Sequence, residues 1–98
     1  MFQNKRYMTR GVDNEIPMGV QVILWAMIEG LQYEGVKADY LQVFRLSEHE
    51  GQQKIIHSQE QPYYQHEIIL LIFAVPVEAE IFVIDDGDHS TMLLAEEY

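Results

Sequence analysis

The residues best suited to chemistry lie near the end of the chain. The stretch IDDGDHSTMLLAEEY, from Ile84 to Tyr98, gathers acidic side chains, a histidine and two hydroxyls within a few positions. They are Asp85, Asp86, Asp88, His89, Ser90 and Thr91. Such a set could bind a metal ion or perform acid–base chemistry, with His57 and Glu60 as further donors. The same residues also predict an acidic hairpin, because Asp-Gly is a strong signal for a tight turn.

The spacing of these residues favours the turn. A calcium loop places acids at alternate positions before a later glycine, whereas Asp85 and Asp86 are adjacent and Gly87 follows at once. The histidines show no HxH or HExxH spacing. We therefore expect no catalytic residue, no metal ligand and no cofactor. The alternative is a metal-dependent or acid–base enzyme that uses Asp86, Asp88, His89, His57 and Glu60.

Composition limits the class of protein. The chain has 98 residues, of which 48% are hydrophobic, and no cysteine. This suits a single domain over residues 1–98 that buries a core without disulfides in a reducing cytoplasm. The first residues, MFQNKRYMTRGV, are polar and basic, unlike a secretory signal, so we expect a cytoplasmic protein.

Charge indicates which partners are excluded. Six lysines and arginines face sixteen aspartates and glutamates, a net charge of -10. This charge repels phosphate backbones and anionic lipid surfaces, so we expect no direct nucleic-acid binding and no membrane contact. An acidic surface of this kind can serve solubility, bind a basic partner, or mimic DNA and occupy a DNA-binding protein.

One helix is clear from the periodicity of the sequence. We expect Asp13 or Asn14 to cap it and Pro17 to lie in its first turn. Its core face has the 3.6-residue spacing of an amphipathic helix and consists of Val20, Ile23, Leu24, Met27, Ile28 and Leu31.

The opposite side of this helix carries a second apolar stripe, which consists of Met18, Val22 and Trp25. Two apolar stripes on one helix need two surfaces to pack against. Either the first strand or a loop covers the second stripe, or it meets a partner or a second copy of the chain.

Strands account for most of the remaining sequence. A weak strand signal covers residues 6–12, and the runs 40–46 and 54–59 form an expected hairpin around SEHEG, with a loop of five or six residues. The apolar run 66–75 favours a buried strand, and 80–84 and 91–95 flank the Asp-Gly turn. LLAEEY could end in a half-turn of helix. The expected fold is α+β, with one amphipathic helix packed in two layers on a mostly antiparallel sheet of about five strands.

A polar and aromatic segment, HSQEQPYY, offers a second possible contact surface, since tyrosine buries a large area while keeping a polar tip. The candidate interface residues are Met18, Val22, Trp25, Gln59, Glu60, Tyr63 and Tyr64. We expect a small acidic domain that is not an enzyme and that acts through contacts with an unknown protein partner or with itself.

Several sequence motifs also indicate a resemblance to a known protein family. RYMTRGV, EIP, LW..I, DYLQVF.L, QKI.H.QE.P.Y and DDGDHSTMLLAEEY occur in this order over about residues 4–98. In this respect the chain resembles domain-of-unknown-function family 960, small cytosolic proteins of Gram-positive bacteria. The resemblance implies a stand-alone cytoplasmic domain, and the family has no established activity, cofactor or catalytic residue to carry over.

Overall fold

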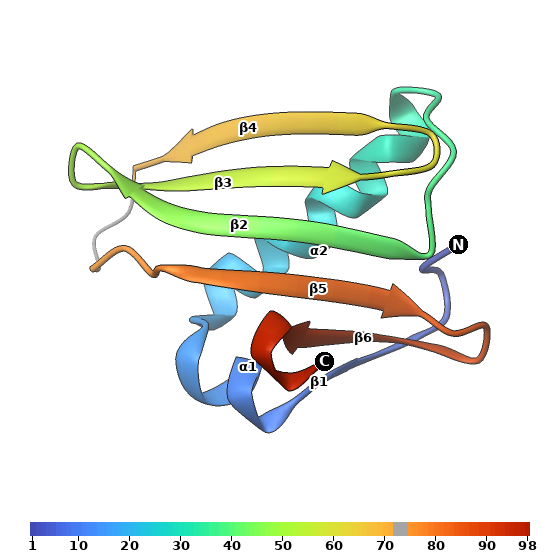
Figure 1. Cartoon of the computed structure of the whole chain (residues 1–98), viewed down its shortest axis with the longest axis horizontal. Coiled ribbons are helices and arrows are strands. Elements are labelled where there is room, and N and C mark those ends of the chain that lie inside the picture. Colours follow the sequence, from blue (N-terminus) through green and yellow to red (C-terminus); the bar gives the residue numbers. More distant parts are fainter. Residues whose placement is uncertain (72–74) are drawn as a thin grey trace.

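A computed structural model describes residues 1–71 and 75–98 of the chain. The elements are β1 (Lys5–Met8), α1 (Arg10–Glu15), α2 (Met18–Tyr33), β2 (Leu41–His49), β3 (Gln52–Gln59), β4 (Tyr64–Leu70), β5 (Ala79–Asp85), β6 (His89–Leu94) and the 3₁₀ turn η1 (Ala95–Glu97). The strands form one sheet in the order β1-β6-β5-β2-β3-β4 (Figure 1). β1 runs parallel to β6, and the other neighbours are antiparallel.

This architecture confirms the α+β class, but the sheet has six strands rather than about five. The first strand is also shorter than expected. It ends at Met8, because the Thr9 side chain accepts a hydrogen bond from the Val12 N–H and caps α1. The strand expected over residues 6–12 is therefore wrong beyond Met8.

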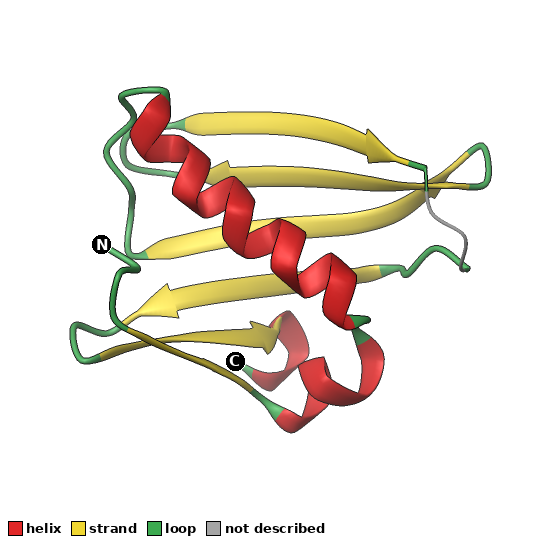
Figure 2. Ribbon diagram, turned by 180° about the vertical axis from the view of Figure 1, so that it is seen from behind, coloured by secondary structure: helices red, strands yellow, loops and turns green. Residues whose placement is uncertain are grey.

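The long helix α2 crosses one face of the sheet diagonally (Figure 2). It begins after Pro17, and no side chain caps it, whereas Asp13 and Asn14 lie inside α1. The cap expected at those two residues is therefore wrong. The expected core face is confirmed, with Val20, Leu24, Ile28 and Leu31 buried and Ile23 and Met27 partly buried against the core.

The sheet face beneath α2 contains both apolar and polar side chains. Phe44, Leu46, Ile55, Ile81 and Val83 belong to the hydrophobic core. The buried polar side chains on the same face are Gln42, Gln53, His57, Gln59, Asp85 and Ser90. Buried amides must be hydrogen-bonded, so this face of the sheet also holds loops in place.

Both predicted hairpins are present. The β2–β3 loop is shorter than expected, because the strands extend to His49 and from Gln52. Glu50 and Gly51 both have positive φ, at 50° and 79°, as a two-residue loop between twisted strands requires. The β5–β6 turn is formed around Gly87, whose φ is 102°. The half-turn expected at the end of the chain is η1.

β4 differs from the buried strand expected over residues 66–75. It pairs with β3 alone, so it forms an edge of the sheet. Gln65, Glu67 and Ile69 are exposed, while Ile68 and Leu70 pack partly against the core. Positions 72–74 of the expected strand lie outside the described residues. None of the described helices has the length and apolarity needed to cross a lipid bilayer.

Candidate functional site

The first candidate, the acidic hairpin, is occupied by its own structural hydrogen bonds. The buried Asp85 carboxylate accepts from Phe2 N at 2.7 Å, Asn4 Nδ2 at 3.0 Å and Gly87 N at 2.8 Å. Burial would raise the pKa of Asp85, but these hydrogen bonds outweigh it and hold the pKa below its ordinary value. Asp85 therefore fastens the N-terminal segment to the hairpin.

The next acids form the predicted turn. Asp86 Oδ1 accepts from the backbone N–H groups of Asp88 and His89, and Asp86 Oδ2 lies 3.2 Å from His89 Nε2. Within residues 1–71 and 75–98, no group of three acidic or histidine side chains is placed to hold a metal ion.

His57 lies elsewhere, in the core. Its ring stacks on Phe44 at 4.5 Å, and its Nε2 donates to Gln42 Oε1 at 2.6 Å. Burial, together with the nearby His66, lowers the pKa of His57 to about 4, so the ring is neutral at pH 7. In the described part of the chain its Nδ1 has no hydrogen-bond partner.

The five residues of the enzyme alternative do not converge. His57 on β3 points toward α2, whereas His89 on β6 contacts Tyr7 on the opposite face, and β2 and β5 separate the two strands. Asp86 and Asp88 belong to the β5–β6 turn, and Glu60 follows β3. The grouping of Asp86, Asp88, His89, His57 and Glu60 into one site is therefore wrong.

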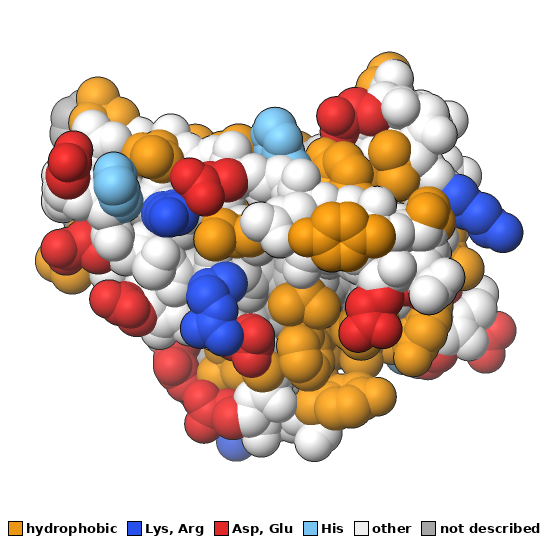
Figure 3. Space-filling view, turned by 45° about the horizontal axis from the view of Figure 1, so that its top comes forward, with side chains coloured by type: hydrophobic (Ala, Val, Ile, Leu, Met, Phe, Trp, Pro, Cys, Tyr) orange, Lys and Arg blue, Asp and Glu red, His pale blue; other side chains and the backbone are white. Residues whose placement is uncertain are grey.

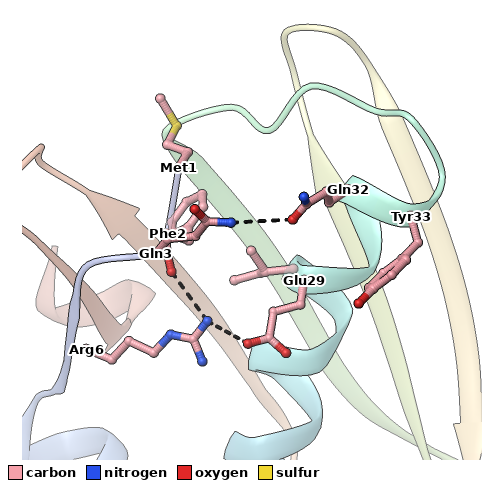
Figure 4. Close-up of a pocket in the computed structure, with 8 residues that line it drawn as sticks. Met1, Phe2, Gln3, Arg6, Glu29, Gln32 and Tyr33 are labelled. Atoms are coloured by element: carbon pink, nitrogen blue, oxygen red, sulfur yellow. Dashed lines mark hydrogen bonds and ion pairs between the residues drawn. The ribbon is translucent and has the colours of Figure 1, made fainter.

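A pocket of about 260 Å³ lies between the N-terminal segment and the end of α2 (Figure 4). Arg6 Nη2 donates to Glu29 Oε2 at 2.8 Å and to Phe2 O at 3.3 Å. Gln3 and Gln32 also pair across it. These polar groups pair with one another and hold the N-terminal segment against α2.

The second stripe of α2 is partly covered. The Arg6 guanidinium lies 4.5 Å from the centre of the Trp25 ring, so β1 shields this tryptophan. Met18 and Val22 remain 60% and 59% exposed. A small cavity of about 170 Å³ separates β1 from this part of the helix. The first strand thus covers Trp25 but leaves the outer part of the stripe open.

Gln59, expected at an exposed interface, is instead buried, which corrects that prediction. Its Nε2 donates to Lys37 O and Pro62 O, at 2.9 and 2.8 Å. Its Oε1 accepts from Asp39 N and Gln42 Nε2, at 3.0 and 2.7 Å. The side chain is 2% exposed and joins two loops, so a partner cannot reach it.

The neighbouring candidates are more accessible. Glu60 is exposed, and Tyr63 is 73% exposed. Tyr64 is half-buried, and its hydroxyl donates to Glu34 Oε2 at 2.7 Å. Burial and this hydrogen bond raise the pKa of Tyr64 to about 12. Tyr64 therefore joins β4 to the end of α2, while Glu60 and Tyr63 remain available.

The sheet face turned away from α2 is the surface that sequence reasoning missed. Strand register places Leu41 beside Ile84 and Val43 beside Phe82, and Ile84 lies beside Thr91. These five half-buried side chains form what we call the apolar half-face. The tyrosines at its border are Tyr7, Tyr40, Tyr63 and Tyr98, which are 49%, 52%, 73% and 77% exposed. Figure 3 shows hydrophobic side chains gathered over the middle of this side of the molecule, between charged ones.

The other half of this face is charged and internally paired. Arg45 Nη2 lies 3.1 Å from Glu80 Oε2, and Lys54 Nζ lies 3.6 Å from Glu67 Oε1. These two carboxylates are neutralised by their neighbours, so the described strands of this face present no row of free acids of the kind a DNA mimic needs.

One sequence signal could have revealed the apolar half-face. The run IFVI in β5 is apolar at every position, whereas a strand with one solvent-facing side alternates. Such a run indicates that both sides of the strand are covered or available for contact.

The architecture defines a small α+β protein whose sheet is crossed by one long helix on one face. The family described as "Staphylococcal protein of unknown function (DUF960)" matches residues 5–97, and the chain belongs to this family. The chain is also similar to a solved structure described as the protein of unknown function from Enterococcus faecalis. That similarity has a TM-score of 0.79 and 31% sequence identity, and covers 97% of this chain and 91% of the other. No curated protein matches the chain.

Proposed function

We propose that the protein is a binding module without catalytic activity, which docks a basic partner protein on the apolar half-face. The observation that supports this is the half-buried row of Leu41, Val43, Phe82 and Ile84, with Tyr98 against Phe82 and exposed tyrosines at its border. Apolar patches bordered by tyrosine have the composition of protein interfaces, because tyrosine combines a large contact area with a polar tip.

The charge of the partner follows from the acids beside this surface. β2 begins, and β3 and β5 end, at one end of the sheet, on the right of Figure 1. Asp39, Glu60, Asp86 and Asp88 belong to the loops at that end. A partner with basic residues around an apolar centre complements both features, and a net charge of -10 would speed its approach.

The same properties support a cytoplasmic role. The chain has no cysteine to form disulfides, and its charge opposes contact with nucleic acid and anionic lipid. Protein partners are therefore the class of ligand that the surface fits best.

The proposal is tested by affinity capture from a bacterial extract with immobilised protein. The test variant is the double substitution Leu41→Ser and Ile84→Ser, and the matched control is Val22→Ser on the exposed stripe of α2. We expect wild type and control to retain a basic protein that the double variant loses, with circular dichroism confirming that all three fold. Retention by the double variant, loss with the control, or no specific capture by wild type would overturn the proposal.

A further inference from the structure

A groove crosses the edge of the apolar half-face, where β2 begins and β3 ends. Its volume is about 320 Å³, and it is lined by Asp39, Tyr40, Leu41, Val43, Ser58, Gln59, Glu60, Tyr63 and Gln65. Val43, Ser58 and Gln65 lie next to one another in the strand register, so they form its floor. Tyr40 and Tyr63 are exposed beside that floor.

The groove is electrostatically unbalanced. Asp39 and Glu60 contribute carboxylates, and no lysine or arginine is among the lining residues. Neither carboxylate forms an ion pair with a basic side chain of the described ranges. A cation would therefore find two carboxylates that no basic side chain of the described ranges neutralises, on a molecule whose net charge is already negative.

Hydrogen bonds join the two backbone segments that carry these acids. The Gln59 side chain binds the backbone of Lys37 and Asp39 on one side and of Pro62 on the other. Gln61 N also donates to Asp39 Oδ2 at 3.1 Å. The loop that carries Asp39 and the turn that carries Glu60 are thus tied together, so little ordering is needed when a ligand binds.

We propose that this groove receives an arginine side chain of the partner protein. The guanidinium lies between Tyr40 and Tyr63 and donates to the carboxylates of Asp39 and Glu60, while its aliphatic stem contacts Leu41 and Val43. This inference rests on the proposed function, because it names the side chain that anchors the basic partner to the apolar half-face.

Arginine fits this groove better than lysine for a geometric reason. Its planar guanidinium stacks on aromatic rings and directs several N–H groups to carboxylates at once, whereas an ammonium is a strongly hydrated point charge. Tyrosine rings and carboxylates together therefore favour the guanidinium. Citrulline, which has the same shape without the charge, provides the corresponding neutral probe.

The experiment is an NMR titration of the full chain with three capped peptides, acetyl-Gly-Arg-Gly-amide and its lysine and citrulline counterparts. We expect saturable shifts of the Ser58, Tyr63 and Gln65 amides with the arginine peptide. The lysine peptide should bind about threefold more weakly, because its ammonium is more strongly hydrated and cannot lie flat on the tyrosine rings. The citrulline peptide should give no saturable shift.

Variants test the position of the site. Glu60→Gln and Tyr63→Ser should each weaken the arginine peptide severalfold, whereas Glu96→Gln and Tyr33→Ser, exposed outside the groove, should not. Shifts spread evenly over all acidic loops, equal binding of the three peptides, or no groove shift at millimolar peptide would overturn the inference. If partner capture still depends on Leu41 and Ile84 in that case, the proposed function stands and the arginine anchor alone fails.

Discussion

At the scale of single residues, His57 makes the stability of the folded protein depend on pH. It lies between Phe44 and Tyr64, and its Nε2 donates to Gln42. Gln42 Nε2 in turn donates to Asp39 O and Gln59 Oε1. Protonation of His57 would place a charge in this buried network, where its Nδ1 has no acceptor among the described residues.

The first prediction is that acid destabilises the protein through His57. Its pKa is lowered from 6.5 to about 4 in the folded state, so the unfolded chain binds the proton more readily. The contribution of neutral His57 to the free energy of unfolding is therefore fully present above pH 6.5. It is lost as the pH falls toward 4, by about 3 kcal/mol at most. Urea unfolding of wild type and His57→Gln across this range should show a shallower pH dependence in the variant. Parallel curves would contradict the prediction.

A second prediction concerns Asp85, which holds the N-terminal segment. In Asp85→Asn a side-chain NH2 replaces one of the two accepting oxygens and faces either Phe2 N or Gly87 N, each of which is itself a donor, so the free energy of unfolding should fall by about 2 kcal/mol. Asp88→Asn, exposed in the same turn, should change it little. Urea unfolding compares the two. Equal stability of both variants would show that Asp85 is not the fastening point.

Because the folded state also lowers the pKa of Asp85, its contribution is present above the ordinary pKa of 3.8 and is lost only as the pH falls below that value. The range from pH 6.5 to 4 thus reports mainly on His57, and more acidic solutions report on Asp85.

The structural environments of individual residues could be predicted from the sequence to different degrees. The Asp-Gly turn was correct, because its geometry is encoded within four consecutive residues. The burial of Gln59 was not, because its partners Lys37 and Asp39 are distant in sequence and only the fold brings them to it. A polar residue at a strand end indicates solvent unless its distant hydrogen-bond partners are known.

At the scale of elements, Gln53 connects β3 to the segment that leads into β5. Its Nε2 donates to Ser47 O and Val77 O, at 3.1 and 3.0 Å, and its Oε1 accepts from Val77 N at 2.8 Å. The two bonds to Val77 resemble those between paired strands, so one side chain takes the place of a strand neighbour at that point.

We predict that Gln53→Leu weakens this connection. The substitution leaves Val77 N–H and C=O without their partner, which should lower the free energy of unfolding by about 2 kcal/mol. Amide hydrogen exchange should also become faster at Val77. Gln52→Leu, at the neighbouring half-buried position on the other face, is the control. Unchanged protection of Val77 would show that the bonds are dispensable.

The elements differed in how clearly the sequence indicated them. α2 was evident because six apolar residues repeat with the helical period. α1, RGVDNE, was missed because it buries Val12 alone and shows no such repeat. The parallel pairing of β1 with β6 joins residues 5–8 to residues 89–92, and no local pattern specifies a partner so distant in sequence.

At the scale of the whole molecule, charge and apolar surface oppose each other. The net charge of -10 repels a second copy, whereas the apolar half-face attracts one. Salt screens the repulsion, since the Debye length falls from about 10 Å at 0.1 M to about 3 Å at 1 M, and it does not weaken apolar contact. The balance between monomer and dimer should therefore depend on ionic strength.

The last prediction is that light scattering gives the monomer mass of 11.5 kDa in dilute salt and a larger mass in about 1 M sodium sulfate. Leu41→Ser with Ile84→Ser should remain monomeric in both, because the substitutions remove apolar contact area. Trp25 emission should not change with dilution, since this residue belongs to α2 and lies against Arg6, on the opposite side of the sheet from the apolar half-face. A constant mass in all salts would show that the half-face does not self-associate. A red shift of Trp25 on dilution would instead place the contact on Met18, Val22 and Trp25, because only an interface at that stripe exposes the indole when the copies separate.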